Sequence, residues 1–301
     1  MPNTLAHIGV QGLLHRTWCS RLDLRWALVG CVLPDLSWIL QRLLIPLVPV
    51  PDLLDLRLYV MVQASLVLCL LPAAALALCA RRPLAAFLLM AGNSMLHLLL
   101  DAVEIKWANG VHLLAPVSWR LTAFGLCWPE SLWISGLTLL GLLVLILQGR
   151  DLLRQPSPLI RPGRGRGLVV LALLLAYLLL PFAWLDAAEV ADNHFVRTLR
   201  QVAERPGRDI AFDRCRYDPA LGAVRIFSGE VLPVRGLTLT EPATLSLNGR
   251  FVDHHVVEVH DWHRHWPLVR DLTSGLGLAA VLLLLIGAGR DKVSGGVARR
   301  S

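Results

Sequence analysis

The sequence is poor in charged residues and lacks the cysteine patterns of several common protein classes. Only 17% of its 301 residues are charged, whereas 55% are hydrophobic and the mean hydropathy is +0.57. Soluble domains carry about 25% charged residues, so this composition excludes an ordinary soluble domain and predicts an integral membrane protein. The six cysteines form no CxxC pair and no regular spacing, which argues against a zinc finger and against a disulfide framework.

The pattern of a cleavable signal peptide is also missing. Residues 1–18 have no basic start and no clear small-residue cleavage site, so we expect the first membrane segments to direct insertion. The net charge of +7 would suit nucleic acid, but the arginines cluster beside apolar segments, which fits anionic lipid headgroups better. We therefore expect membrane lipids as partners and no nucleic acid, and the sequence carries no signal for an oligomeric state.

Long apolar runs are abundant, and runs of about 20 residues can cross a bilayer as helices. Residues 3–15 predict a shorter helix that is re-entrant or interfacial. The expected fold class is therefore mainly α, a polytopic membrane helical bundle of about six spans plus a short N-terminal helix. The predicted spans are 26–47, 57–80, 83–103, 128–148, 167–185 and 271–289.

The basic residues predict how these spans are oriented. If six spans alternate, all the basic clusters fall on one side, which should be cytoplasmic and should include the C-terminus. The loop 103–127 and the long segment 186–270 then fall on the opposite side. The clusters are Arg16, Arg21 and Arg25; Arg81 and Arg82; Arg150, Arg154, Arg161, Arg164 and Arg166; and Arg290, Lys292, Arg299 and Arg300.

Segment 186–270 reads as a small α+β domain. "DAAEVADNHFVRTLRQVAE" is amphipathic and predicts one helix, and short strand-like runs with glycine, proline and asparagine between them follow. We expect a β-barrel or sandwich of five or six strands on the extracytoplasmic side. The domains are thus 1–185, a membrane bundle; 186–270, an extracytoplasmic helix and β-domain; and 271–301, a final membrane helix with a basic cytoplasmic tail.

A polar stripe marks the third predicted span. In "NSMLHLLLDAVE", Asn93, His97, Asp101 and Glu104 share one face of a helix because successive residues advance about 100°. Ionisable groups at membrane depth cost roughly 2.5–3.5 kcal/mol each, so they usually face a bundle interior or a wet cavity. The stripe therefore indicates either a hydrogen-bonded network between helices or a functional site.

Two other segments carry similar residues. Asn3, His7 and Gln11 are spaced by four and share a face of the N-terminal helix, and Asp35 follows Pro34 in the first predicted span. Two histidines and two aspartates suit Zn²⁺, Mn²⁺ or iron, which lower the pKa of bound water. We assign His7, Asp35, His97 and Asp101 as ligands of a divalent metal, zinc or manganese, with Asp101 and Glu104 as catalytic carboxylates and Asn3, Gln11 and Asn93 supporting the ligands.

These residues carry a resemblance to a known family. His7, "LPD" at Leu33–Asp35 and "HLLLD" at His97–Asp101 resemble the YdjM-like membrane-bound metal-dependent hydrolases of bacterial inner membranes, over roughly the first 125 residues. The resemblance implies a metal-binding membrane bundle with hydrolase activity and no settled substrate. The chain departs from the family pattern at Ser37, where a second acid is typical, and in "RLYVMVQASLV", which lacks the family's histidines.

Three functional hypotheses remain open at this point. The first is a metal-dependent hydrolase of the bacterial inner membrane, with a site near the outer leaflet and a lipid-linked or envelope substrate. The second is a non-catalytic envelope scaffold or assembly factor that binds a partner through its β-domain, which the missing family histidines favour. The third is a transporter with an acid–histidine proton relay, ranked last because the chain lacks two evident membrane repeats.

Two further groups of residues invite a functional interpretation. His112 and Trp119 lie in the predicted outer loop and could contact substrate, although interfacial anchoring explains them more simply. "HHVVEVHDWHRHW" is rich in histidine, but strand alternation would place His254 and His260 on one face and His255 on the other. We therefore expect a wet surface there rather than a metal site.

Overall fold

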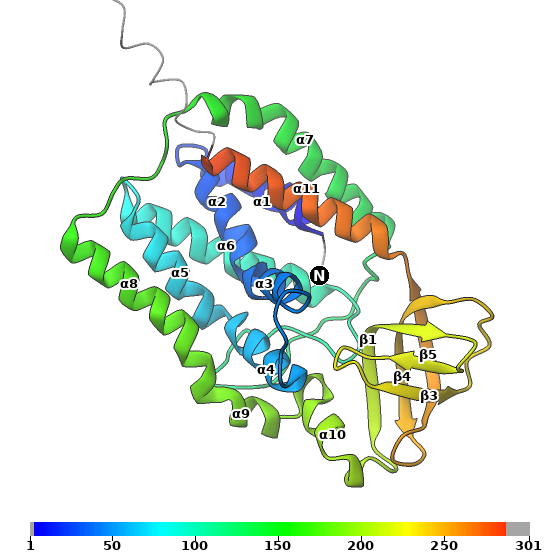
Figure 1. Cartoon of the computed structure of the whole chain (residues 1–301). Coiled ribbons are helices and arrows are strands. Elements are labelled where there is room, and N and C mark those ends of the chain that lie inside the picture. Colours follow the sequence, from blue (N-terminus) through cyan, green and yellow to red (C-terminus); the bar gives the residue numbers. More distant parts are fainter. Residues whose placement is uncertain (1–2, 287–301) are drawn as a thin grey trace, which may run out of the picture.

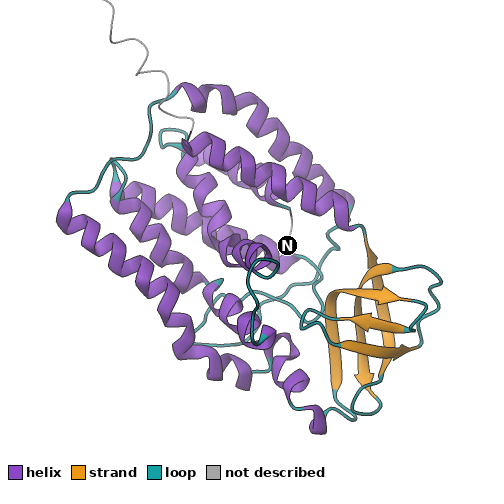
Figure 2. Ribbon diagram, viewed as in Figure 1, coloured by secondary structure: helices purple, strands orange, loops and turns teal. Residues whose placement is uncertain are grey.

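The protein is a helical bundle with a β-barrel at one end, and its computed structural model describes residues 3–286 (Figures 1 and 2). The basic cluster predicted to be the cytoplasmic tail, Arg290 to Arg300, lies outside the described residues. Within them, five helical segments are long and apolar enough to cross a membrane, or six if one bent pair is a single span. The coarse prediction of an apolar bundle joined to a β-domain is thus confirmed.

Most of the predicted spans correspond to one helical segment each. The first contains α2 (Leu24–Val32), the 3-10 turn η1 (Leu33–Asp35) and α3 (Leu36–Leu44). The others are α6 (Pro83–Val103), α7 (Leu132–Arg154), the run α8 (Arg164–Leu179), η2 (Leu180–Trp184) and α9 (Leu185–Val190), and α11 (Pro267–Ile286).

The predicted span 57–80 is instead a bent pair of helices. The helices α4 (Leu53–Gln63) and α5 (Leu66–Leu78) meet at an angle of 65°. Ser65 adopts extended backbone angles between them, which ends the helical hydrogen-bond ladder. Hydropathy could not show this break, because the residues on both sides of it are apolar.

The N-terminal helix α1 (Thr4–Trp18) is enclosed by later helices. It packs against α7 so closely that a Cβ added at Gly141 would lie 1.8 Å from the carbonyl oxygen of Leu5. On another side, a Cβ at Gly277 of α11 would lie 2.9 Å from the Cβ of Thr4. The predicted short helix therefore exists, and glycines let it approach its neighbours backbone to backbone.

Five strands form a closed barrel in the order β1-β2-β3-β5-β4. Every pairing is antiparallel except that between β3 and β5. The predicted β-domain is confirmed at this level, although its sequence pattern did not indicate β3, which contains Pro233. The bounds are β1 (Asp209–Asp218), β2 (Ala223–Arg225), β3 (Val231–Arg235), β4 (Ala243–Phe251) and β5 (Val257–His265).

The single amphipathic helix predicted before the barrel is wrong. The chain forms α9, the short turn η3 (Asn193–Phe195), α10 (Val196–Arg200) and the turn η4 (Val202–Glu204). Asp192, His194 and Phe195 have positive φ angles of 50°, 59° and 55°, which no continuous right-handed helix allows. Asp192 instead accepts hydrogen bonds from the backbone and side chain of Thr198 and begins the next turn.

The connectors rich in arginine gather at the end of the bundle away from the barrel (Figure 1). Ala80 and Leu159 form a β-bridge that joins the α5–α6 turn to the α7–α8 connector. The buried Arg25 donates to the carbonyl oxygen of Pro156 at 2.9 Å and pairs with Asp23 at 2.7 Å. Basic segments far apart in the sequence are thus neighbours in space.

Candidate metal centre and basic cavity

Three helical segments bring the predicted ligands together. His7 lies on α1, Asp35 ends the turn η1, and His97 and Asp101 lie one turn apart on α6. Pro34 occupies the first turn of η1, where its missing N–H costs nothing, and Asp35 follows it. Both histidine side chains are fully buried, and the two aspartates are 6% exposed.

The compact centre consists of His7, His97 and Asp101, whose candidate ligand atoms all lie within 4.8 Å of one another. His7 Nε2 is 3.4 Å from Asp101 Oδ1, and His97 Nε2 is 3.8 Å from Asp101 Oδ2. The two imidazole rings stack at 3.8 Å with an interplanar angle of 9°. Asp35 joins through His97, with Oδ1 3.5 Å from Nε2.

These separations fit atoms around a shared ion better than hydrogen bonds. Charge-assisted hydrogen bonds are about 2.7–2.9 Å long, whereas tetrahedral ligands about 2.0–2.1 Å from zinc are roughly 3.3 Å apart. Both nitrogens of His7 and of His97, and Oδ1 of Asp35 and of Asp101, are buried without a hydrogen bond in the described part of the chain. The buried Cys31 thiol faces His97, but a thiol is a weak hydrogen-bond partner. The residues therefore fit a divalent metal.

Lys106 binds the acidic end of the polar stripe. Its Nζ lies 3.3 Å from Asp101 Oδ2 and 3.6 Å from Glu104 Oε2. Burial opposes the charge on Lys106, but Asp101 and Glu104 outweigh it and hold the pKa of Lys106 above its ordinary value. Glu104 is buried and is not part of the cavity wall described below.

The three residues predicted to support the ligands make hydrogen bonds to the backbone and to Thr138. Asn3 accepts from the backbone N–H of Ala6 and donates to Thr138 of α7, so it caps and anchors α1. Gln11 donates to the carbonyl oxygen of Asn93 at 3.1 Å. Asn93 donates to the carbonyl oxygen of Leu89 in its own helix. None of these hydrogen bonds reaches a candidate ligand; they hold helices in place, and the supporting role of the three residues stays a prediction.

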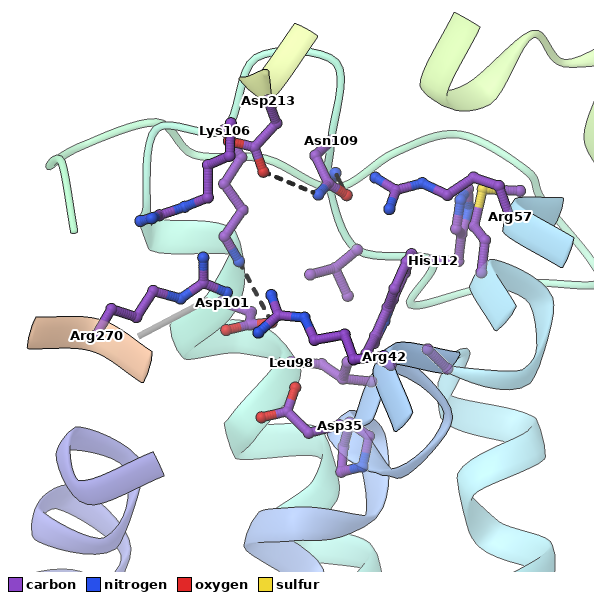
Figure 3. Close-up of a pocket in the computed structure, with 17 residues that line it drawn as sticks. Asp35, Arg42, Arg57, Leu98, Asp101, Lys106, Asn109, His112, Asp213 and Arg270 are labelled. Atoms are coloured by element: carbon purple, nitrogen blue, oxygen red, sulfur yellow. Dashed lines mark hydrogen bonds and ion pairs between the residues drawn. The ribbon is translucent and has the colours of Figure 1, made fainter. Parts of the chain in front are cut away.

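A cavity of about 220 Å³ opens beside the centre, between the bundle and the barrel (Figure 3). Asp35 and Asp101 form part of its floor, and Asp213 of β1 lies across from them. Asn109, in the loop after α6, donates to Asp213 at 3.3 Å and connects that loop to the barrel. The candidate ligands are therefore reached from the junction of the two parts of the molecule.

Cations dominate the wall of this cavity. In Figure 3 the guanidinium groups of Arg42 and Arg270 and the ammonium group of Lys106 come together above Asp101. Arg57, which stacks over Trp38 and meets His194, enters from α4. The wall holds five cations and three carboxylates: Arg42, Arg57, Lys106, Arg214 and Arg270, with Asp35, Asp101 and Asp213.

The barrel adds Arg214 through a bulge. The register between β1 and β4 shifts between Phe212 and Cys215, and Arg214 has a φ of 57°. Such strained backbone often marks sites where a side chain must be re-aimed. Burial and the neighbouring Arg270 lower the pKa of Arg214 to about 10, because the two cations repel each other.

The two predicted substrate residues behave differently. His112 lines the cavity and is 3% exposed, and neither of its ring nitrogens makes a hydrogen bond within residues 3–286. Burial lowers the pKa of His112 to about 4, so the ring is neutral at pH 7. Trp119 meets the edge of this ring at 5.9 Å and is not part of the cavity wall.

The histidine-rich stretch is arranged differently from the prediction. His254 and His255 precede β5, so the assumed strand alternation does not apply to them. His263 and His265 instead meet Glu130, and these three residues form the second group within residues 3–286 that could hold a metal. Their contacts are short, however: His265 Nδ1 is 2.8 Å from Glu130 Oε1 and its Nε2 is 2.7 Å from Ser246 Oγ. Both ring nitrogens of His265 are thus already used in hydrogen bonds.

Sequence reasoning missed the basic wall of the cavity. Lys106 carried a usable signal, because it is one of only two lysines in the chain and follows Asp101 by five residues. Arg42 and Arg270 sit near the ends of apolar segments, where arginines are expected as anchors. Arg214 had no signal, since only the fold brings the bulge of β1 to the bundle.

Ser37 occupies the position where the resembled family has a second acid. It is buried, and its hydroxyl donates to the carbonyl oxygen of Val60 at 3.3 Å. No family model, no curated protein and no solved structure matches the chain. The interpretation of the site therefore rests on its own geometry.

Proposed function

We propose that the protein is a metal-dependent hydrolase of the bacterial inner membrane that acts on a lipid-linked or envelope substrate. The observation that carries the proposal is the buried centre of His7, His97 and Asp101 beside a cavity, with ligand atoms that make no hydrogen bond in the described part of the chain. Asp35 completes a set of two nitrogens and two carboxylates that suits zinc or manganese. When bound, such a metal makes hydroxide available near neutral pH.

The chain's own residues divide the remaining tasks. Lys106 bridges Asp101 and Glu104, so it keeps the Asp101 carboxylate turned toward the centre and stabilises its charge. Because Glu104 contacts Lys106 from behind the cavity wall, we assign it to positioning Lys106. Like Asp35, Asp101 faces both the centre and the cavity, and its two carboxylate oxygens lie beside His7 and His97.

The depth of the site supports a substrate at the outer surface. Asp101 lies about 28 Å along α6 from Arg82 at 1.5 Å per residue, close to the thickness of a ~30 Å hydrocarbon core. The arginine-rich connectors gather at the opposite end, which supports placing them in the cytoplasm. In this orientation segment 186–270, which includes the barrel, is periplasmic and covers the site.

Metal analysis of the purified full chain tests the proposal. Wild-type protein should contain about one zinc or manganese ion, and the double variant His97→Ala/Asp101→Ala should contain none while still inserting into membranes. Equal metal content in both samples would contradict the metal assignment. A wild-type protein without metal would favour the alternative, a non-catalytic envelope scaffold that binds a partner through its barrel.

A further inference from the structure

A second hollow continues from the cavity toward the outside of the bundle. This groove, about 210 Å³, runs between α3 and α11 and shares Asp35, Trp38, Arg42 and Arg270 with the cavity wall. Ile39, Leu43 and Leu278 supply most of the surface of its remaining wall, and Gly275 leaves space on α11; Thr4, Asp271 and Ser274 also line it.

The groove opens on a face that suits hydrocarbon. Leu43 is 58% exposed on α3, and Leu272 and Leu276 are each 62% exposed on α11. Both helices belong to segments apolar enough to cross a membrane. An exposed ion pair between Arg42 and Asp271, at 3.5 Å, crosses the opening. Such an exposed pair contributes little stability, so a ligand can displace it at small cost.

The charge of the inner cavity points to an anion. The wall holds five cations, and three of them also pair with carboxylates outside it: Lys106 with Glu104, Arg214 with Glu130 and Arg42 with Asp271. Among the described residues, neither Arg57 nor Arg270 forms an ion pair with a carboxylate, so these two cations remain available to an anionic ligand. His112 adds a buried, neutral ring with no hydrogen-bond partner in the described range. Guanidinium and ammonium groups of this kind recognise phosphate oxygens.

We infer that the cavity binds the phosphate group of a membrane lipid, whose hydrocarbon chain leaves the site between α3 and α11. The inference rests on the proposed function, because it names the substrate class of the same centre. The basic cavity alone would suit a free phosphate ester equally well. The continuous apolar groove is what favours a ligand with both a phosphate and a chain.

Three probes separate the two parts of this ligand. Full-length protein in nanodiscs or detergent is titrated with dioleoyl phosphatidic acid, with glycerol 3-phosphate, which lacks chains, and with dioleoylglycerol, which lacks phosphate. Phosphatidic acid should bind most tightly of the three. Equal binding of dioleoylglycerol would overturn the phosphate assignment, and equal binding of glycerol 3-phosphate would overturn the lipid assignment.

Variants test the groove and the cavity separately. A side chain at Gly275 meets open space, so Gly275→Leu should fold and fill the groove. We expect it to weaken phosphatidic acid binding roughly tenfold, the equivalent of a few lost methylene contacts, and to leave glycerol 3-phosphate binding unchanged. Gly136→Leu is the matched control, because Gly136 also faces open space on α7 and lies outside the groove. Equal effects of the two variants would overturn the groove assignment.

Arg270→Gln should weaken both phosphate-containing probes roughly tenfold, the effect of losing one charge-assisted hydrogen bond. Arg225→Gln, on the exposed side of β2, is the matched control. Unchanged binding in Arg270→Gln would overturn the cavity assignment. Metal content measured on the same samples keeps the two proposals apart. Stoichiometric metal without lipid binding contradicts this inference alone, whereas lipid binding without metal contradicts the proposed hydrolase alone.

Discussion

The molecule contains two clusters of histidine and carboxylate with similar composition and opposite hydrogen-bonding states. In the bundle, His7, His97 and Asp101 are held 3.4–3.8 Å apart, and the ring nitrogens make no hydrogen bonds in the described part of the chain. At the barrel, Glu130 Oε1 lies 2.8 Å from His265 Nδ1, and Glu130 Oε2 lies 3.2 Å from His263 Nε2. Within the described residues, the buried ring nitrogens of the first cluster lack the hydrogen bonds that satisfy those of the second.

This difference teaches that ligand spacing alone does not identify a metal site. Burial raises the pKa of Glu130, but His265, His263 and Arg214 outweigh burial and bring that pKa down to about 2. Trp128 stacks on His263 at 3.7 Å and covers one side of the cluster. Glu130, His263 and His265 therefore join the loop before α7 to strand β5 through charged contacts. The bundle cluster is the better place for an ion.

The strongest test of the comparison is the distribution of metal between the two clusters. His97→Ala should remove the bound metal completely, since it deletes a ligand at the centre of the set. His263→Ala should leave the metal content unchanged. Elemental analysis of both purified variants decides the matter, and metal loss in His263→Ala with retention in His97→Ala would reverse the roles of the clusters.

We expect the contacts of Glu130 with His263, His265 and Arg214 to contribute to the stability of the fold rather than to metal binding. Glu130→Ala leaves His265, His263 and Arg214 without their common carboxylate, in a site where the Glu130 side chain is 17% exposed. We expect a loss of about 3 kcal/mol in the free energy of unfolding, typical of a broken buried ion pair. Denaturation followed by tryptophan fluorescence measures it. Metal content should not change, and a stable variant that has lost its metal would contradict the proposed division.

The bundle cluster can be disturbed without changing a ligand. Gly141→Ala places a Cβ against the carbonyl oxygen of Leu5, so α1 must move and carry His7 with it. The expected cost is about 2 kcal/mol of stability, in the range for overpacking, together with weaker metal binding. Gly136→Ala is the control on the same helix, because it meets open space. Identical metal affinity in the two variants would show that the fit of α1 does not set the position of His7.

The smallest expected effect concerns His112, which, like the bundle histidines, is buried with ring nitrogens that make no hydrogen bond among residues 3–286. Its pKa is about 4 in the folded protein, below the ordinary value of 6.5 that the ring has in an unfolded chain, so folding favours the neutral ring. The resulting stability is present above pH 6.5 and is lost as the pH falls toward 4. Lowering the pH from 7.5 to 5.5 should cost about 1 kcal/mol through this group. His112→Phe should flatten that part of the stability profile, and an unchanged profile would contradict the assignment.

Sequence periodicity predicted the elements of the bundle well because hydropathy controls them directly. His97 and Asp101 share a helix face by spacing alone, and α6 was predicted with the bounds 83–103 that it has. The bend between α4 and α5 was missed, since Ser65 interrupts hydrogen bonds without interrupting hydropathy. Local patterns describe single elements, and they carry no information on the angle between two of them.

The assembly of the site was only partly predictable. That His7, Asp35 and His97 would meet followed from the scarcity of polar residues at membrane depth, where such groups seek one another. The roles of Asn3 and Gln11 depended on neighbours that no spacing reveals, namely Thr138 and the backbone of Asn93. The basic wall depended on tertiary contacts between the barrel and the bundle, which lie outside any local pattern.

The enclosure of α1 has a consequence for how the protein is made. His7 lies on α1, and the glycines that receive this helix, Gly141 on α7 and Gly277 on α11, are synthesised much later than α1. α1 can therefore take its final position only after α7 and α11 have been made. Until then α1 lacks the close contacts that fix the position of His7 beside His97. The candidate metal centre therefore takes its final geometry only after α7 and α11 have joined the bundle.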